Sequence, residues 1–232
     1  MSVDESAGVS RAAGSSADRA LLELKQAIVR GALLPGSVVS ENELAGKLGM
    51  SRTPVRQALD RLRADGWVTI APRSGVTIAT IDPDSIQDIY EALSALEGAA
   101  CLRFDATNAP AMRQLEAATA ACEIALENND LVGWADADDR LHGILLAECG
   151  NSQLLRLARP LMDHAHRVRL HTVKLRPFPT SSNEDHRRIL ERISAGDREG
   201  ARDELLQHRR RGMDVVLPIL RRLTPTATPF LS

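Results

Sequence analysis

Asp138 and His142 stand four positions apart in a predicted helix, and both are residue types that bind divalent metal ions. Because four residues make about one helical turn, both side chains would project from the same face. His186 and His208 lie on two other predicted helices, each close to an apolar stripe. Spacing alone does not join these two histidines to the first pair. Together, three neutral imidazoles and one carboxylate would suit zinc, nickel, manganese or iron, with positions left for water or a ligand.

The other three histidines, His164, His166 and His171, are interpreted as hydrogen-bonded core or surface residues, the usual role of a single histidine. His164 and His166 are two positions apart, so on a helix they would face different sides. The sequence therefore gives no reason to place them in a shared site.

A second group of polar residues could recognise nucleic acid. Near the start of a predicted helix lie Arg52, Thr53, Arg56 and Gln57, beside an apolar stripe of Val55, Ala58, Leu59 and Leu62. Arginine can pair with the edge of guanine in the major groove, and the partial positive charge of a helix N-terminus favours phosphate. A solvated surface is the alternative interpretation of such a row of arginines. The neighbouring elements favour the DNA interpretation.

Those neighbouring elements are short and follow one another closely over residues 18–80. A helix from the N-cap Asp18 to Gly31 precedes a second one, which the capping box Ser40-Glu41-Asn42-Glu43 starts and Gly49 ends. Ser51 caps the third helix, which ends at Gly66, and the runs 67–70 and 76–79 flank Pro72-Arg73-Ser74-Gly75 as a hairpin with a basic tip. Helix, helix-turn-helix and hairpin is the order of a winged helix.

From residue 81 the pattern changes to long amphipathic segments, which predict an all-α bundle. The predicted helices cover residues 84–104, 110–127, 131–149, 152–175, 182–195 and 198–222. The expected fold is therefore mainly α, a winged helix-turn-helix followed by a helical bundle. The expected segments are a disordered leader (1–17), the winged helix (18–80), the bundle (81–223) and a flexible tail (224–232).

Composition and charge fit two such domains. The chain of 232 residues is 44% hydrophobic and only 3% aromatic, which favours a core of Leu, Ile, Val and Ala over a β-sandwich. The net charge of −2 combines a basic segment over residues 18–80 with an acidic remainder. Three widely spaced cysteines, no apolar leader and no membrane-length apolar run predict a cytoplasmic protein that does not enter a membrane.

Several sequence blocks in the first third resemble the N-terminal domain of GntR-family transcriptional regulators. The blocks are Ile28-Val-Arg-Gly-Ala-Leu-Leu-Pro-Gly-Ser, Ser40-Glu-Asn-Glu-Leu-Ala, Leu48-Gly-Met-Ser-Arg-Thr-Pro-Val-Arg-Gln-Ala-Leu and Leu62-Arg-Ala-Asp-Gly-Trp-Val. The resemblance implies a homodimer that binds a palindromic double-stranded DNA operator. Asn42 stands where many relatives have an arginine. The expected DNA-binding residues are Asn42, Ser51, Arg52, Thr53, Arg56, Gln57, Arg73, Ser74 and Gly75.

The second domain is similar to the FCD effector domain of the FadR subfamily. The similarity rests on Asp138-Asp-Arg-Leu-His142, Gly150-Asn-Ser-Gln-Leu-Leu, Glu184-Asp-His-Arg-Arg-Ile-Leu, Ala195-Gly-Asp and Leu205-Leu-Gln-His208. In metal-binding members of this subfamily, residues at these places ligate a divalent ion. The resemblance therefore implies one metal site made of Asp138, His142, His186 and His208.

The combined resemblance implies a transcriptional regulator, expected to be a repressor, that a small organic acid controls from a site near the metal. Many relatives carry an arginine that meets this acid at the position of Leu93. The cations considered in its place are Arg103, Arg140, Arg167 and Arg169. The alternative function is a metal-dependent enzyme, but no general base or nucleophile stands in a recognisable motif, and an enzyme would not need a winged helix.

Overall fold

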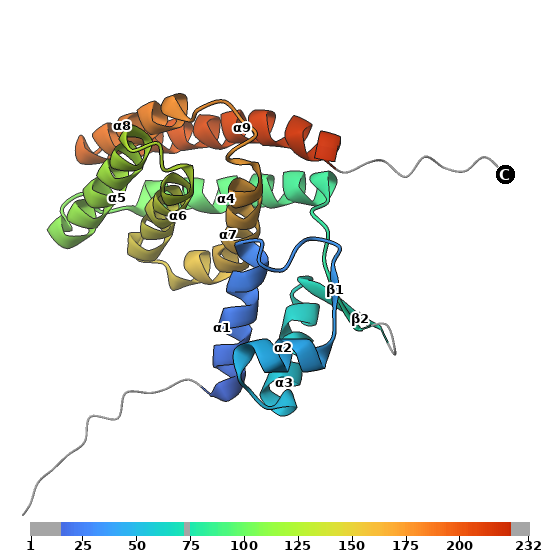
Figure 1. Ribbon diagram of the computed structural model, residues 1–232. Coiled ribbons are helices and arrows are strands. Elements are labelled where there is room, and N and C mark those ends of the chain that lie inside the picture. The colour runs from blue at the N-terminus through green and yellow to red at the C-terminus, as the bar shows by residue number, and fades with distance from the viewer. Residues whose placement is uncertain (1–14, 72–74, 224–232) are drawn as a thin grey trace, which may run out of the picture. The chain divides into compact units, whose positions relative to one another are not determined.

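The computed structural model describes residues 15–71 and 75–223, which fall into two compact units (Figure 1). The first unit runs to Ile28 and continues over Gly36–Ala79, and the second holds Val29–Pro35 and the chain from Thr80 onward. The expected flexible tail, most of the expected leader, and the wing-tip residues Arg73 and Ser74 lie outside the described residues.

The first unit is a winged helix-turn-helix, as predicted. Its helices are α1 (Ser16–Val29), α2 (Glu41–Leu48) and α3 (Arg52–Ala64), and its strands are β1 (Val38–Val39), β2 (Val68–Ala71) and β3 (Gly75–Ile78). The strands form an antiparallel sheet in the order β1-β3-β2, with Thr77 of β3 opposite Val38 on one side and Thr69 on the other. The predicted hairpin is thus confirmed. The strand β1 was not predicted, because two residues are too few to show an alternating pattern.

Local hydrogen bonds explain where these helices begin. The Ser40 hydroxyl accepts from the Glu43 amide and the Glu43 side chain accepts from the Ser40 amide, so the predicted capping box is confirmed. The prediction that α1 starts at Asp18 is wrong, because Ser15 and Asp18 form the same reciprocal pair of bonds and start the helix at Ser16. Ser51 occupies the N-cap of α3, but its side chain makes no capping hydrogen bond.

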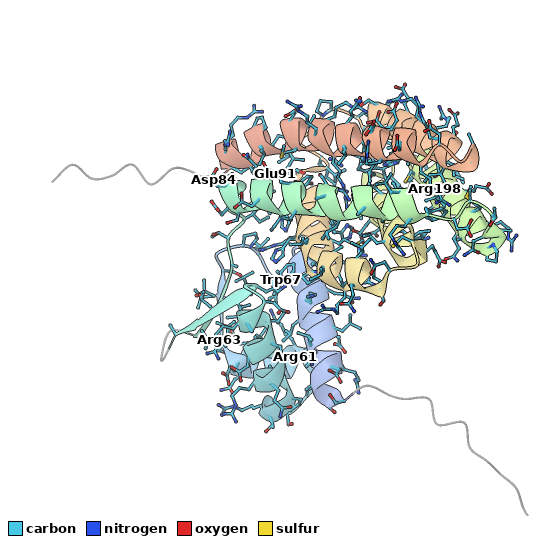
Figure 2. All side chains as sticks on the ribbon, turned by 180° about the vertical axis from the view of Figure 1, so that it is seen from behind. Arg61, Arg63, Trp67, Asp84, Glu91 and Arg198 are labelled. Atoms are coloured by element: carbon cyan, nitrogen blue, oxygen red, sulfur yellow. The ribbon has the colours of Figure 1, made fainter. Side chains whose placement is uncertain are left out.

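The apolar stripe of α3 fills the core of this unit. Val55, Leu59 and Leu62 are buried, and so is Trp67, which follows the helix (Figure 2). Figure 2 also shows Arg61 and Arg63 on the C-terminal part of the same helix, and both are exposed. The buried stripe therefore fixes which side chains of α3 remain on the surface.

The second unit is the predicted all-α bundle. Its helices are α4 (Pro83–Arg103), α5 (Ala109–Glu127), α6 (Leu131–Glu148), α7 (Ser152–Thr172), α8 (Thr180–Ser194) and α9 (Arg198–Leu223). In Figure 1, α4 and α9 run side by side, and α5 packs on α6. All six predicted helices are present, although α7 ends at Thr172, three residues earlier than predicted.

Inside the bundle, apolar clusters surround a set of buried polar groups. Leu93, Leu141 and Leu145 are almost completely buried. This agrees with the Leu-rich core that the low aromatic content predicts. The buried acidic, histidine and arginine residues of this unit, among those described, are Glu97, Asp138, His142, Arg167, Arg169, Asp185, His186, His208 and Arg209. No described helix has the length and apolar character needed to cross a membrane.

Candidate metal centre and nucleic-acid interface

The bundle brings the four predicted metal ligands into one cluster. Asp138 and His142 of α6, His186 of α8 and His208 of α9 each offer a ligand atom, and these atoms all lie within 4.8 Å of one another. All four residues are buried, none exposing more than 7% of its surface. Segments up to 70 positions apart in the sequence thus meet at one point, which spacing alone did not predict.

The local sequence explains why these side chains point inward. Asp138 and His142 lie one turn apart on the face of α6 that also carries the buried Leu141 and Leu145. His186 is one turn before the buried Ile189 on α8, as expected of residues three apart. The three imidazole rings are 4.7 to 5.8 Å apart between centroids, so they form a compact group.

Two carboxylates outside the predicted ligand set stand behind the histidines. An oxygen of Glu97 lies 3.4 Å from Nδ1 of His142, and an oxygen of Asp185 lies 3.3 Å from Nδ1 of His208. A carboxylate that accepts the proton of one ring nitrogen leaves the other nitrogen with its lone pair free for a metal. Glu97 and Asp185 are therefore positioned to orient the two imidazoles. The one signal in the sequence was an acidic residue at a helix position where the apolar periodicity predicts a buried side chain.

Burial and neighbouring charges set the protonation states of this cluster. Burial lowers the pKa of His208 to about 3 and also lowers the pKa of His142. Burial alone would raise the pKa of Glu97, but Arg209 and His142 bring it down to about 2. Burial would likewise raise the pKa of Asp138, but the Arg169 guanidinium holds it well below the usual value. At neutral pH these imidazoles are neutral and the carboxylates are anionic, as metal ligation requires.

The nitrogen atoms of the cluster provide a test of whether a metal ion fits. Among the described residues, no group makes a well-oriented hydrogen bond with either ring nitrogen of His142 or His186, although all four nitrogens are buried. A buried polar atom without a hydrogen bond is costly, and such atoms are rare in folded proteins. A divalent ion would bind the lone pair of one nitrogen in each neutral ring and remove that part of the cost. The residues present therefore fit a divalent metal ion.

The four arginines predicted as alternatives for binding the effector do not lie together in the structure. Arg169 is bound to Asp138 at 2.7 Å and to Asp139 at 3.5 Å, so acidic neighbours already compensate its charge. Arg103 and Arg140 are exposed. Arg167 is buried, and burial lowers its pKa to about 10. Leu93, at the position where many relatives carry arginine, is completely buried in the apolar core.

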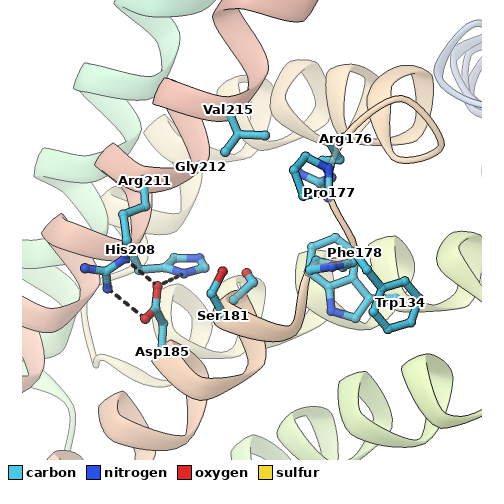
Figure 3. A pocket seen from close by; sticks show the side chains of 12 residues that line it. Trp134, Arg176, Pro177, Phe178, Ser181, Asp185, His208, Arg211, Gly212 and Val215 are labelled. Carbon is cyan, nitrogen blue, oxygen red and sulfur yellow. Dashed lines mark hydrogen bonds and ion pairs between the residues drawn. The ribbon is translucent and has the colours of Figure 1, made fainter.

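A pocket reaches the cluster at His208 (Figure 3). It lies between the segment that joins α7 to α8 and the middle of α9, and its cavity volume is about 90 Å³. In Figure 3, Asp185 stands between His208 and Arg211, and Phe178 lies beside Trp134 on the facing wall. The lining residues are Trp134, Arg176, Pro177, Phe178, Pro179, Ser181, Ser182, Asp185, His208, Arg211, Gly212 and Val215.

In the first unit, the start of α3 presents its polar side chains to the surface. Arg52, Thr53, Arg56 and Gln57 are exposed, as is Ser51. Since the apolar stripe holds the opposite face of α3 in the core, these residues are free to enter a groove. Arg61 of the same helix is bound to Asp18 of α1 at 2.6 Å, so its guanidinium is engaged elsewhere.

A shallow depression joins the start of α3 to the wing. It is lined by Ser40, Glu41, Asn42, Arg52, Arg63, Ile70, Ala71, Gly75 and Val76. The structure thus brings Asn42, Arg52 and Gly75 to one surface. Gly75 has a φ of +86°, and a Cβ there would lie 3.0 Å from the Val39 carbonyl oxygen, so the close strand pairing requires glycine.

Comparison with known proteins agrees with this two-part architecture. Residues 16–78 match the model of the gntR family of bacterial regulatory proteins, and residues 88–211 match the FCD domain. An uncharacterized HTH-type transcriptional regulator in the TAR-I ttuE-ttuC' intergenic region of Agrobacterium vitis is 43% identical over 147 residues, or 62% of this chain and 86% of the relative.

Two further similarities span more of the chain. The HTH-type transcriptional repressor GlaR of Escherichia coli K12 is 24% identical over 196 residues, covering 80% of this chain and 88% of the relative. The solved structure of E. coli McbR/YncC superimposes with a TM-score of 0.74 at 22% identity, covering 90% of this chain and 99% of that one. At that identity, the structural likeness concerns the fold.

Proposed function

The chain belongs to the GntR family of bacterial regulatory proteins and is a transcriptional regulator with an FCD domain, and on this basis we propose a ligand-controlled repressor. In this proposal, residues 18–80 read a DNA operator and residues 81–223 sense a small organic acid beside a divalent metal ion. The observation that carries it is that one chain combines an exposed polar start of α3 with a buried Asp/His cluster that a pocket reaches.

For the DNA-binding part, we assign base contacts to the start of α3. Arg52 and Arg56 are exposed, and an arginine that pairs with guanine contributes about 1–3 kcal/mol of discrimination. Contacts to the backbone or an adjacent groove are assigned to Asn42 and Gly75, which share a surface with Arg52, and to Arg73 and Ser74. Ser51, Thr53 and Gln57 are the remaining residues that we assign to DNA binding. A homodimer would place two such helices on the halves of a palindromic operator.

For the sensing part, we assign the divalent ion to Asp138, His142, His186 and His208. The support is their mutual closeness, their burial and the ring nitrogens that lack hydrogen bonds. A bound ion of this kind would supply a positive centre beside the acid. Glu97 and Asp185 would keep two of the imidazoles in the orientation and tautomer that ligation needs.

The role of this site is binding rather than catalysis, since both matched families are regulators. An effector controls DNA affinity only if it binds one arrangement of the dimer more tightly than the other. We propose that the acid favours the arrangement with lower operator affinity. The name of the GlaR repressor supports this sign of regulation, and the family's role in transcription supports a cytoplasmic location.

The test begins with DNA selected by the full-length, metal-loaded protein from a pool of random duplexes. The selected sequences should contain two inverted half-sites, and gel filtration should show a dimer. Carboxylic acids that raise the melting temperature should then weaken operator binding in a fluorescence anisotropy assay. A selected pool without a common sequence would contradict operator recognition. Acids that bind tightly and leave DNA affinity unchanged would contradict ligand control.

A further inference from the structure

The pocket beside His208 has a shape that suits a small ligand. It extends from Phe178, which is 48% exposed, to His208, which is 7% exposed. Its cavity volume of about 90 Å³ leaves room for a small ligand only. Because His208 also belongs to the Asp/His cluster, a ligand in this pocket would lie against the candidate metal centre.

One cation in the pocket wall has buried nitrogen atoms to which none of the described residues makes a hydrogen bond. Nε and Nη2 of Arg176 are buried, and within the described residues neither has a hydrogen-bond partner. The guanidinium instead lies over the ring of Trp134, 4.7 Å from its centroid. Two buried guanidinium nitrogens without a hydrogen bond are unfavourable, so this arrangement is expected where a ligand supplies the missing acceptor. Burial also lowers the pKa of Arg176, in agreement with a desolvated position.

The other charges that line the pocket are already paired. Arg211 donates from Nε to Asp185 at 2.9 Å, and the same carboxylate faces Nδ1 of His208 at 3.3 Å. Figure 3 shows this group on one side of the pocket and Arg176 on the other. Of the charged side chains that line the pocket within the described residues, Arg176 is the one whose buried nitrogens lack a hydrogen bond. The protein side chains therefore offer one place for a carboxylate, at Arg176.

Most of the remaining wall is apolar, apart from Ser181 and Ser182. The ring of Trp134 lies beneath Arg176, Phe178 lies beside Trp134 in Figure 3, and Pro177, Pro179 and Val215 also line this wall. The indole Nε1 of Trp134 donates to Asn183 at 2.8 Å, which fixes the plane of the ring. Rigid aromatic and proline surfaces contact planar apolar groups well and lose little entropy on binding.

We propose that this pocket binds a monocarboxylic acid with a flat apolar body, and that Arg176 holds its carboxylate while Trp134 and Phe178 contact its ring. This inference rests on the proposed function and specifies the class of effector. It also assigns the carboxylate to an arginine in the segment between α7 and α8, in place of Arg103, Arg140, Arg167 and Arg169.

The experiment uses full-length, metal-loaded protein with benzoate and phenylacetate as probes, benzyl alcohol as a neutral analogue and citrate as a multiply charged acid. Binding is measured by calorimetry and by the fluorescence of Trp134, with Trp134→Phe to identify the signal. Benzoate or phenylacetate should bind more tightly than benzyl alcohol and citrate. Arg176→Gln should weaken binding about ten- to a hundredfold, the usual worth of a charge-assisted hydrogen bond.

Two further variants separate the role of Arg176 from general damage. Arg140→Gln, at an exposed position of the same unit, should bind the probes as the unchanged protein does. Arg176→Lys should restore part of the affinity, because it keeps the charge and loses the planar contact with Trp134. Melting temperatures of the ligand-free variants show whether each one is folded.

The proposal is overturned if neither aromatic acid binds, if citrate binds more tightly than both, or if Arg176→Gln binds the probes with unchanged affinity. These outcomes differ from failure of the proposed function. A protein that recognises a palindromic operator but binds no aromatic acid refutes the ligand class alone. A protein that binds benzoate through Arg176 but selects no DNA sequence refutes operator recognition alone.

Discussion

Glu97 of α4 and Arg209 of α9 form a buried ion pair in the middle of the bundle. Arg209 donates from Nε to one carboxylate oxygen at 2.6 Å and from Nη2 to the other oxygen. Glu97 is completely buried and Arg209 is 4% exposed. The oxygen that accepts from Nε also lies 3.4 Å from Nδ1 of His142. The pair therefore links the packing of two helices to the orientation of a candidate metal ligand.

Removing Arg209 should destabilise the metal-free protein severely. In Arg209→Met, the Glu97 carboxylate stays buried without its partner, which typically costs about 3–5 kcal/mol. The double variant Glu97→Leu/Arg209→Met removes both charges and should recover most of this loss. The free energy of unfolding should be measured in urea, with a chelator present, for the unchanged protein, Arg209→Met and the double variant.

The control for this experiment is Arg192→Met, which breaks the exposed pair with Asp197. Its effect should be much smaller, because water screens exposed ion pairs. Equal stability losses in Arg209→Met and in the double variant would show that the two residues act independently.

Metal content tests the assignment of the four ligands. The purified protein should hold close to one divalent ion per chain, and His142→Ala or His186→Ala should lose it, since each removes a buried ligand. Elemental analysis after dialysis measures the content. Chelation should also lower the melting temperature of the unchanged protein, because a ligand of the folded state stabilises it.

His164→Ala is the matched control, since His164 lies on α7 outside the cluster. It should keep the ion. Full occupancy in both His142→Ala and His186→Ala would mean that other residues hold the metal.

Operator binding tests the assignment of α3. Arg52→Ala and Arg56→Ala should each weaken specific binding by about 1–3 kcal/mol per half-site, because each removes a cation that can pair with a base. Fluorescence anisotropy on the selected palindrome and on an unrelated duplex separates specific from general binding.

Arg61→Ala is the control on the same helix. Its guanidinium is bound to Asp18 of α1, so its loss should change operator affinity far less. A larger effect at Arg61 than at Arg52 and Arg56 would place the DNA on a different face of α3.

The sequence predicted the helices well because their signals are local. The Ser40 capping box, the Gly49 terminus and the apolar stripe of α3 each depend on residues within one or two turns. The strand β1 was missed because two residues cannot show a period. The start of α1 was misplaced because Ser15 and Asp18 were not recognised as a reciprocal cap.

The candidate metal site could not be predicted from residue spacing alone. Asp138 and His142 share a helix face, so their closeness follows from periodicity. Their meeting with His186 and His208 depends on how α6, α8 and α9 pack, and was expected from a resemblance alone. Glu97 and Asp185 face the imidazoles across helix contacts, and Arg176 lies outside any regular element. No local pattern marks such residues.

The histidines should make the stability of the metal-free protein depend on pH. Burial lowers the pKa of His208 from 6.5 to about 3, so the folded state keeps this imidazole neutral while the unfolded chain protonates it below 6.5. The unfolded state then binds more protons, and stability falls as the pH drops through this window. Above 6.5 the contribution is fully present. His142 acts in the same direction, since its pKa is also lowered.

His208→Gln tests this effect, because glutamine does not titrate. In urea unfolding between about pH 5 and pH 7 with a chelator present, the unchanged protein should lose stability toward acid more steeply than the variant, by up to about 1.4 kcal/mol per pH unit for one proton. This range lies above the ordinary pKa of Glu97, 4.5, so that carboxylate contributes little to the slope. Identical slopes in the two proteins would show that His208 titrates normally and is therefore solvated in the metal-free state.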